Sequence, residues 1–157
     1  MTRHVRGLGV SIAVAILIAD LSSKFVMVSF LTKSGGLVDL VPFFDLRLGY
    51  NPGVSFGLLG SHSDWMPWAL ALIAFIISAY LVMRLWRAKH KRDAIWIGLI
   101  IGGALGNAID RLMDGVVTDF IDLHVFDYHW PTFNLADIAI VLGVAMVLLG
   151  SIRNSAK

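Results

Sequence analysis

Residues 65–83 decide the fold: they read WMPWALALIAFIISAYLVM, 19 residues without a charge. A helix of about 20 apolar residues crosses the hydrocarbon layer of a bilayer. The rest of the chain has a matching composition, because 57% of its 157 residues are hydrophobic and only 15% are charged. Soluble domains usually have about 25% charged residues. We therefore predict one integral membrane domain, 1–157. The composition argues against a soluble enzyme, a nucleic-acid-binding protein and a disordered chain.

Four segments are apolar and long enough to be membrane spans, although three of them have ionisable residues near one end. Their approximate ranges are 8–28, 65–85, 94–110 and 134–152. The fold class that they predict is membrane all-α, a bundle of four transmembrane helices.

The two segments that join the spans on one side, 29–64 and 111–133, contain more than loop signals. Apolar residues alternate with polar ones at Leu46, Leu48 and Tyr50, which is typical of a strand, and Pro42 suits a turn or a sheet edge. We expect 38–50 to form a small extracytoplasmic β-sheet, a cradle beside the helices.

Positive charge predicts the orientation. One side of the bundle has nine cations and one aspartate, whereas the other side, with the adjoining helix ends, has four cations and ten aspartates. Short cytoplasmic loops are enriched in Lys and Arg. Both termini should therefore be cytoplasmic. The sequence contains neither Cys nor Glu, so thiolate chemistry is excluded and carboxylate chemistry falls to Asp.

Polar residues inside the spans need a partner or a task, because each charge costs about 2.5–3.5 kcal/mol on insertion scales. Asp20 and Lys24 are four residues apart on one helix face. One interpretation is an intrahelical ion pair that only lowers this cost. In the other, the pair also orients neighbouring groups or the substrate backbone.

The third span combines a glycine pattern with a polar stripe. Gly98, Gly102 and Gly106 have the small-xxx-small spacing of closely packed helices. Gly103, Asn107 and Arg111 are also four residues apart, with Asp110 beside them. Packing explains the glycines, but a polar stripe at the outer end of a span also suits a substrate backbone.

Asp137 stands at the start of the last span, three residues after Asn134, with no cation near it in sequence. Such a carboxyl must hydrogen-bond across the bundle, be protonated, or both. Two carboxyls that share one proton can activate water and polarise a peptide carbonyl, as in aspartic proteases. Asp137 is therefore a candidate for one member of a catalytic pair.

The second carboxyl is Asp119, Asp110 or Asp122. Apolar neighbours favour Asp119, because burial raises a carboxyl pKa. Asp110 adjoins Arg111, which suggests a structural ion pair, and Asp122 is expected to face water. We favour Asp119, although spacing alone keeps Asp110 as an alternative.

Two other functions remain open. Gly53-Val54-Ser55-Phe56-Gly57 fits the G-x-S-x-G pattern, so a rhomboid-like serine protease could use Ser55 with His124 or His129. That pattern has meaning only between a strand and a helix of an α/β sheet, which is not predicted here. A non-enzymatic scaffold or ion-relay subunit could use Asp20, Lys24 and Asp137. We see no metal-ligand spacing and expect neither a metal nor a cofactor.

Five blocks of the chain resemble, in order, the lipoprotein signal peptidases (type II signal peptidases), bacterial aspartic proteases of the cytoplasmic membrane. The blocks are DLSSK at 20–24, NPGVSFG at 51–57, GGALGNAIDR at 102–111, TDFI at 118–121 and FNLAD at 133–137. Together they extend over nearly the whole chain. Thr118 stands where the commonest form of the family has Val.

The resemblance implies that Asp119 and Asp137 are the catalytic pair. The supporting and substrate-binding residues that it implies are Asp20, Lys24, Asn51, Gly53, Gly103, Asn107, Asp110, Arg111 and Asn134. It implies removal of signal peptides from diacylglyceryl-modified prolipoproteins, by cleavage before the lipidated cysteine. The expected partners are these precursors and membrane lipids, with no nucleic acid. We expect a monomeric multi-pass enzyme of the bacterial cytoplasmic (inner) membrane, with its active site on the extracytoplasmic side.

Overall fold

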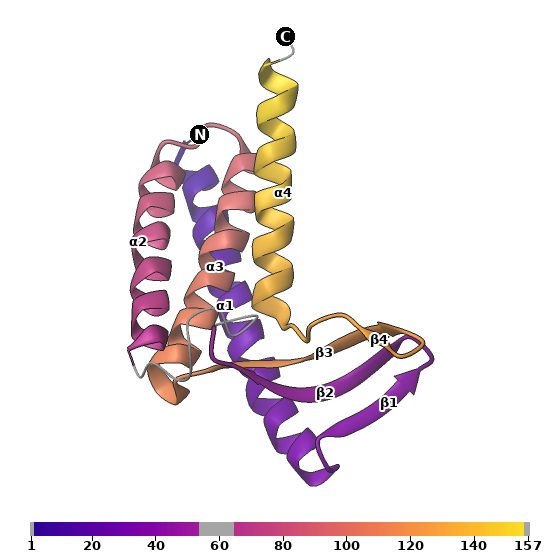
Figure 1. The fold of residues 1–157 in the computed structure, drawn as a ribbon. Helices are drawn as coiled ribbons and strands as arrows, with labels where there is room; N and C mark the ends of the chain where they lie inside the picture. The colour runs from indigo at the N-terminus through magenta and orange to yellow at the C-terminus, as the bar shows by residue number, and fades with distance from the viewer. Residues whose placement is uncertain (1, 54–64, 156–157) are drawn as a thin grey trace.

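The computed structural model describes residues 2–53 and 65–155. In this part of the chain, four helices and four strands follow in the order α1, β1, β2, α2, α3, β3, β4, α4. The helices lie side by side, and the strands form a sheet across one end of the bundle, while the two chain ends lie at the other (Figure 1). The predicted fold class, four apolar helices with a small sheet, is confirmed.

The helices are long and apolar enough to cross a membrane. Their bounds are Thr2–Lys33 for α1, Met66–Trp86 for α2, Lys91–Asp114 for α3 and Leu135–Ser155 for α4. All four helices extend beyond the predicted spans, and α1 does so at both of its ends. Helix α3 ends at Asp114, and its C-cap Gly115 has a φ of 72°, which suits a residue without a side chain.

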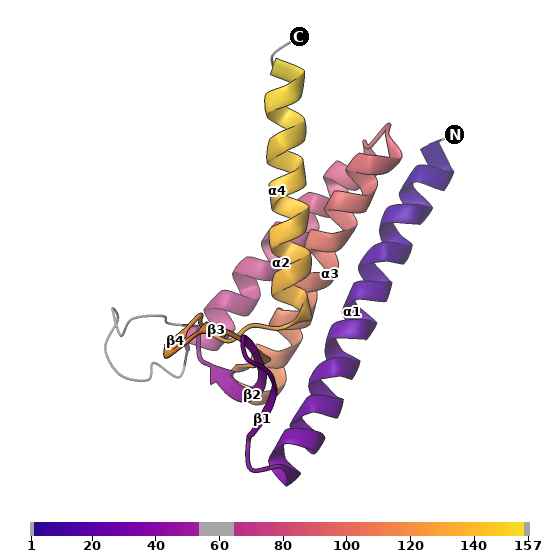
Figure 2. The same ribbon diagram turned by 90° about the vertical axis from the view of Figure 1, so that its right-hand side faces the viewer.

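Helix α3 is the centre of the bundle, because it packs against all three other helices. Its glycines face different neighbours: Gly98 approaches the backbone of Gly9 in α1, and Gly103 approaches the backbone of Ala136 in α4. The close helix packing that the small-xxx-small spacing predicts is therefore present between α3 and α1. In the turned view, α4 diverges from α1 and α3 toward the chain ends, whereas α1 and α3 keep a similar tilt (Figure 2).

The sheet is antiparallel, with strands in the order β1-β2-β3-β4. Its strands are Leu37–Val41, Phe44–Asn51, Val117–Val125 and Tyr128–His129. The first two correspond to the predicted strands, with Pro42 in the turn between them. The predictions did not identify β3, the strand that contains Asp119, although its alternating Val117, Asp119, Ile121 and Leu123 were a readable signal.

Alternation gives the sheet two different faces. One face contains Asp119, Ile121 and Leu123 of β3, with Gly49 opposite Asp119 and Leu46 opposite Ile121. The other face contains Asp122 and His124 of β3. Beyond Asp119 the first face is therefore apolar, whereas the other face contains the ionic groups.

Candidate active site

Helix α4 begins with a reciprocal cap that fixes Asp137. The Oδ1 atom of Asn134 accepts a hydrogen bond from the Asp137 N–H at 3.0 Å, and Asp137 Oδ2 accepts one from the Asn134 N–H at 3.2 Å. This is the arrangement of a capping box. It places a carboxylate at the N-terminus of a helix, where negative charge is stabilised.

Asn134 also holds Asp119. Its Nδ2 atom donates to Asp119 Oδ1 at 2.7 Å, while its other polar atoms bind Asp137. The second oxygen of Asp137, Oδ1, accepts a hydrogen bond from Asn107 Nδ2 at 2.8 Å. One fully buried asparagine therefore connects the two carboxyls that the sequence suggested as a pair.

The two carboxyls differ in their surroundings. Asp119 is 2% exposed, whereas Asp137 is partly accessible. Burial, and next the negative charge of Asp137, raise the pKa of Asp119 from its ordinary 3.8 to about 6; hydrogen bonds from Asn134 and Asn51 oppose this shift. Asp119 is therefore the carboxyl that retains a proton to higher pH than usual.

Lys24 lies behind the pair in a buried cluster. Its Nζ atom is 2.7 Å from Asp20 Oδ2 and 2.9 Å from Asp110 Oδ2, and it donates to Asn107 Oδ1 at 2.9 Å. Asp20 Oδ1 accepts the N–H of Ala136, in the first turn of α4, at 2.9 Å. The predicted ion pair of Asp20 and Lys24 thus exists, but it is part of a network that joins α1, α3 and α4.

Arg111 and the end of β2 lie on the other side of the pair. Arg111 Nη1 donates to the Asn107 carbonyl oxygen at 3.2 Å, and its buried Nε atom has no hydrogen-bond partner among the described residues. Asn51 reaches Asp119, and its Oδ1 atom accepts the Gly53 N–H at 2.8 Å. Gly53 has a φ of 92° and lies against Leu70 and Arg111, so a side chain there would be strained and crowded.

The structure contradicts the expectation for Asp122 and changes the partner expected for Asp110. Asp122 does not face water: it is 1% exposed, with Oδ2 at 2.6 Å from Arg47 Nε and Oδ1 at 2.9 Å from His129 Nδ1. Asp110 has a structural ion pair, as expected, but with Lys24 rather than with its neighbour Arg111. The reason in both cases is tertiary, because the partners come from other strands or helices.

Asp110 also contributes at the start of β3, since its Oδ2 atom accepts the N–H of Thr118 at 3.1 Å. The Thr118 carbonyl oxygen in turn accepts a hydrogen bond from Asn134 Nδ2 at 3.3 Å. Asp110 therefore stabilises the strand that presents Asp119, and it is Asp119 that contacts Asn134. Ser55, the candidate nucleophile of the alternative protease, lies outside the described residues.

Known proteins resemble this chain over most of its length. The family model for signal peptidase (SPase) II matches residues 12–153. A lipoprotein signal peptidase of Polynucleobacter necessarius is 40% identical over 92% of this chain and 89% of its own length. The lipoprotein signal peptidase of Yersinia enterocolitica is 45% identical, over 87% of this chain and 82% of its own.

Solved structures agree with the sequence matches. Two structures described as a bacterial membrane enzyme, determined by the in meso method at 2.3 Å and 1.9 Å resolution, superpose with TM-scores of 0.78 and 0.76. They are 28% and 29% identical to this chain. The first superposition covers 95% of this chain and 90% of the solved chain, and the second covers 92% of both chains. With the family model matching almost from end to end, this chain belongs to the signal peptidase II family of membrane proteases.

Proposed function

We propose that this protein is an aspartic endopeptidase that removes signal peptides from diacylglyceryl-modified prolipoproteins by cutting before the lipidated cysteine. The observation that carries the chemistry is Asn134, which binds Asp119 with its amide nitrogen and Asp137 with its amide oxygen and backbone N–H. The substrate class is supported by the curated relatives, which are named lipoprotein signal peptidases.

The unequal surroundings of the pair support unequal starting roles. Asp137 accepts two N–H groups and is partly accessible, so it is the carboxylate that takes a proton from the attacking water. Asp119, with a pKa of about 6, is the protonated partner that donates to the carbonyl oxygen of the scissile bond. When the tetrahedral intermediate collapses, Asp137 gives its proton to the leaving amine, and Asp119 recovers its own from the oxygen.

Lys24 and Asn107 position Asp137 in this proposal. An ammonium group only donates hydrogen bonds, so the Asn107 amide must turn its oxygen, and not its NH₂ group, toward Lys24. The amide NH₂ is then directed at Asp137 Oδ1. Arg111 and Gly103 lie on the same helix as Asn107. The buried Arg111 Nε atom has no partner among the described residues and would donate to a substrate carbonyl, and Gly103 lets α4 approach α3.

The apolar face of the sheet suits the acyl chains of the precursor. It continues from Asp119 along Ile121 and Leu123, with Leu46 beside them. Each CH₂ group that is buried contributes about 0.8 kcal/mol, so binding of the lipid would favour modified precursors over unmodified ones.

We further propose the location and state of the enzyme. The nine cations on the side of the chain ends support a bacterial cytoplasmic membrane protein whose sheet and catalytic pair are extracytoplasmic (Figure 1). It acts as a monomer among membrane lipids, since both carboxyls and all their described ligands come from one chain.

The test is reconstitution in vesicles with a lipidated precursor and with the same precursor lacking the lipid. Wild type should cleave only the lipidated form, while Asp119→Asn and Asp137→Asn should abolish cleavage and remain folded. Ser55→Ala should retain substantial activity. Normal cleavage by either Asn variant would rule out the aspartate mechanism. An inactive Ser55→Ala variant, together with labelling of wild-type Ser55 by a serine-directed probe, would indicate a serine mechanism instead.

A further inference from the structure

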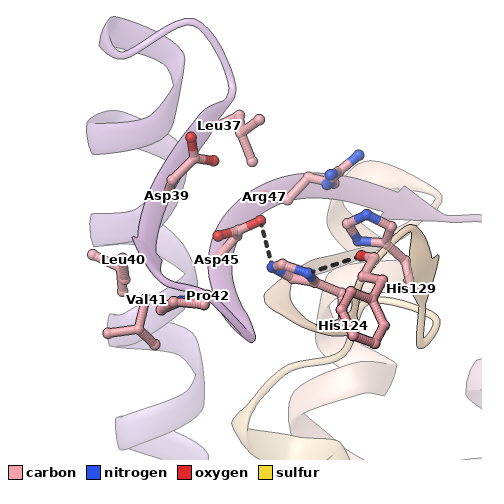
Figure 3. A pocket seen from close by; sticks show the side chains of 10 residues that line it. Leu37, Asp39, Leu40, Val41, Pro42, Asp45, Arg47, His124 and His129 are labelled. Carbon is pink, nitrogen blue, oxygen red and sulfur yellow. Dashed lines mark hydrogen bonds and ion pairs between the residues drawn. The ribbon is translucent and has the colours of Figure 1, made fainter.

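The face of the sheet opposite Asp119 contains a pocket of about 470 Å³ beside the turn that connects β3 and β4. Its walls come from β1, β2 and this turn, and two histidines lie along one side (Figure 3). The imidazole rings of His124 and His129 are stacked with their centroids 4.8 Å apart. His124 is five residues along β3 from Asp119 and on the opposite face of the sheet, and the proposed reaction does not use this cluster.

Both ring nitrogens of His124 face oxygen atoms. Nδ1 is 3.3 Å from the carbonyl oxygen of Phe126, and the buried Nε2 is 3.1 Å from Asp45 Oδ2 (Figure 3). A neutral imidazole has one donor and one acceptor nitrogen, whereas an imidazolium has two donors. A neutral ring that donates its Nδ1–H to Phe126 would turn the lone pair of Nε2 toward the Asp45 carboxylate, whereas the protonated ring has an N–H at both nitrogens.

The contact of His124 with Asp45 also depends on charge. It is close enough for an ion pair but is not aligned as a hydrogen bond. Coulomb attraction does not require alignment, so a charged ring gains from Asp45 while a neutral ring gains little. Asp45 is 6% exposed, which strengthens the interaction of the two charges.

The groups around His124 have an excess of negative charge, which protonation of the histidines reduces. Asp39, Asp45 and Asp122 lie directly opposite one another on three neighbouring strands. Like charges in such positions destabilise a sheet. Arg47 and His129 both contact Asp122, and Asp39 has no partner among the described residues. Three carboxylates thus face one permanent cation, Arg47, so proton uptake by the histidines reduces the imbalance.

We propose that the sheet has a proton-dependent clasp, in which protonated His124 fastens the β3–β4 turn to β2 through Phe126 and Asp45. Phe126 has a φ of 52°, an uncommon value for a residue with a side chain, so the turn needs outside support to keep it. Loss of the proton removes one of the two contacts and restores repulsion between the aspartates. The tip of the sheet then opens at higher pH.

The clasp would regulate the proposed active site, because β3 contains both His124 and Asp119. Only this regulatory role rests on the proposed function, since the opening of the sheet can be measured without a substrate. Two hydrogen bonds report on the tip: Trp130 N–H to the Leu123 oxygen at 2.8 Å, and His124 N–H to the Phe43 oxygen at 3.1 Å.

The experiment is hydrogen exchange of the full-length protein in detergent or vesicles at about pH 5.5 and at about pH 8. Rates are corrected for the intrinsic effect of pH. In wild type, the amides of Trp130 and His124 should be protected roughly tenfold better at the lower pH. His124→Phe, which keeps a ring but has no N–H, and Asp45→Asn should both bring this ratio close to one.

His4→Gln, on the exposed start of α1, is the matched control and should keep the wild-type ratio. If His124→Phe fails to form the sheet, Asp45→Asn carries the test. Equal protection at both pH values in wild type, or an unchanged ratio in Asp45→Asn, would overturn the clasp. Cleavage of lipidated precursor does not enter this result, so the proposed function stands or falls separately.

Discussion

At the scale of single residues, the proton on Asp119 links activity to pH. Burial raises its pKa from 3.8 to about 6, so the folded protein keeps this proton where the unfolded chain has lost it. Because the unfolded state binds fewer protons in this window, stability falls as pH rises from about 4 to about 6 and then levels off. The total change is of the order of 3 kcal/mol.

We therefore expect unfolding measured against pH to lose this slope in Asp119→Asn. Cleavage by wild type should decline above about pH 6, because Asp119, the proposed donor to the scissile carbonyl, is then ionised. An activity that keeps rising through pH 8 would assign the proton to another group.

Lys24 provides a second prediction at this scale. Lys24→Met leaves the buried carboxylates Asp20 and Asp110 without their cation, which should cost about 3–5 kcal/mol. Replacing one of them as well, in Lys24→Met with Asp20→Asn, should recover much of this stability. The double variant should nevertheless stay slow, because the Asn107 amide oxygen then loses its shorter, charged donor and keeps only the 3.2 Å hydrogen bond from Asn134 Nδ2.

Denaturation in detergent and cleavage of lipidated precursor separate these effects. If Lys24 has only a structural role, cleavage will recover in parallel with stability. If Lys24 positions Asn107, the stability will recover but the rate of precursor cleavage will stay low.

At the scale of elements, the start of α4 combines a helix cap with a contact to the proposed catalytic pair. Asn134→Ser keeps an oxygen that can accept the Asp137 N–H but loses the amide that donates to Asp119. Asn134→Ala loses both, and removal of a cap costs about 1 kcal/mol. We expect Ser to be more stable than Ala, while both reduce cleavage by about a hundredfold.

Paired unfolding and cleavage measurements check this expectation. A Ser variant with wild-type cleavage would mean that the contact with Asp119 is dispensable. Equal stability of Ser and Ala would mean that the cap contributes nothing.

At the scale of the whole molecule, α3 holds the bundle together by close approach. A Cβ atom at Gly103 would lie 2.5 Å from the Ala136 oxygen and 2.9 Å from Ile140, so Gly103→Ala must push α4 away from α3. We expect a loss of about 1–3 kcal/mol and slower cleavage, since α4 carries Asp137. Gly150→Ala, in α4 and with nothing within 4 Å of the added Cβ, is the control.

Gly150→Ala should be neutral or more stable by up to about 1 kcal/mol, because alanine is the better helix former. Thermal unfolding of both variants in the same detergent measures the difference. If the Gly103 variant is as stable as the Gly150 variant, the packing of α4 on α3 is looser than the contacts suggest.

Much of the candidate site was predictable because its residues lie within short segments. Asp20 with Lys24, and Asn134 with Asp137, are spaced for contact within one helix or its cap, and the structure places each pair together. Asp122 was not predictable, because its burial depends on Arg47 and His129, which reach it from β2 and β4. The same applies to Asp110, whose partner Lys24 is in α1.

Composition and spacing by themselves determined that this is a four-helix membrane protein with a small sheet and a carboxylate chemistry. Hydrophobic length and local charge are properties of consecutive residues, so no folding is needed to read them. Only the tertiary structure decided which aspartate meets Asp137, because β3 and α4 are brought together through Asn134. Burial and hydrogen bonds then give the two carboxyls different environments, and these depend on contacts between segments far apart in the chain.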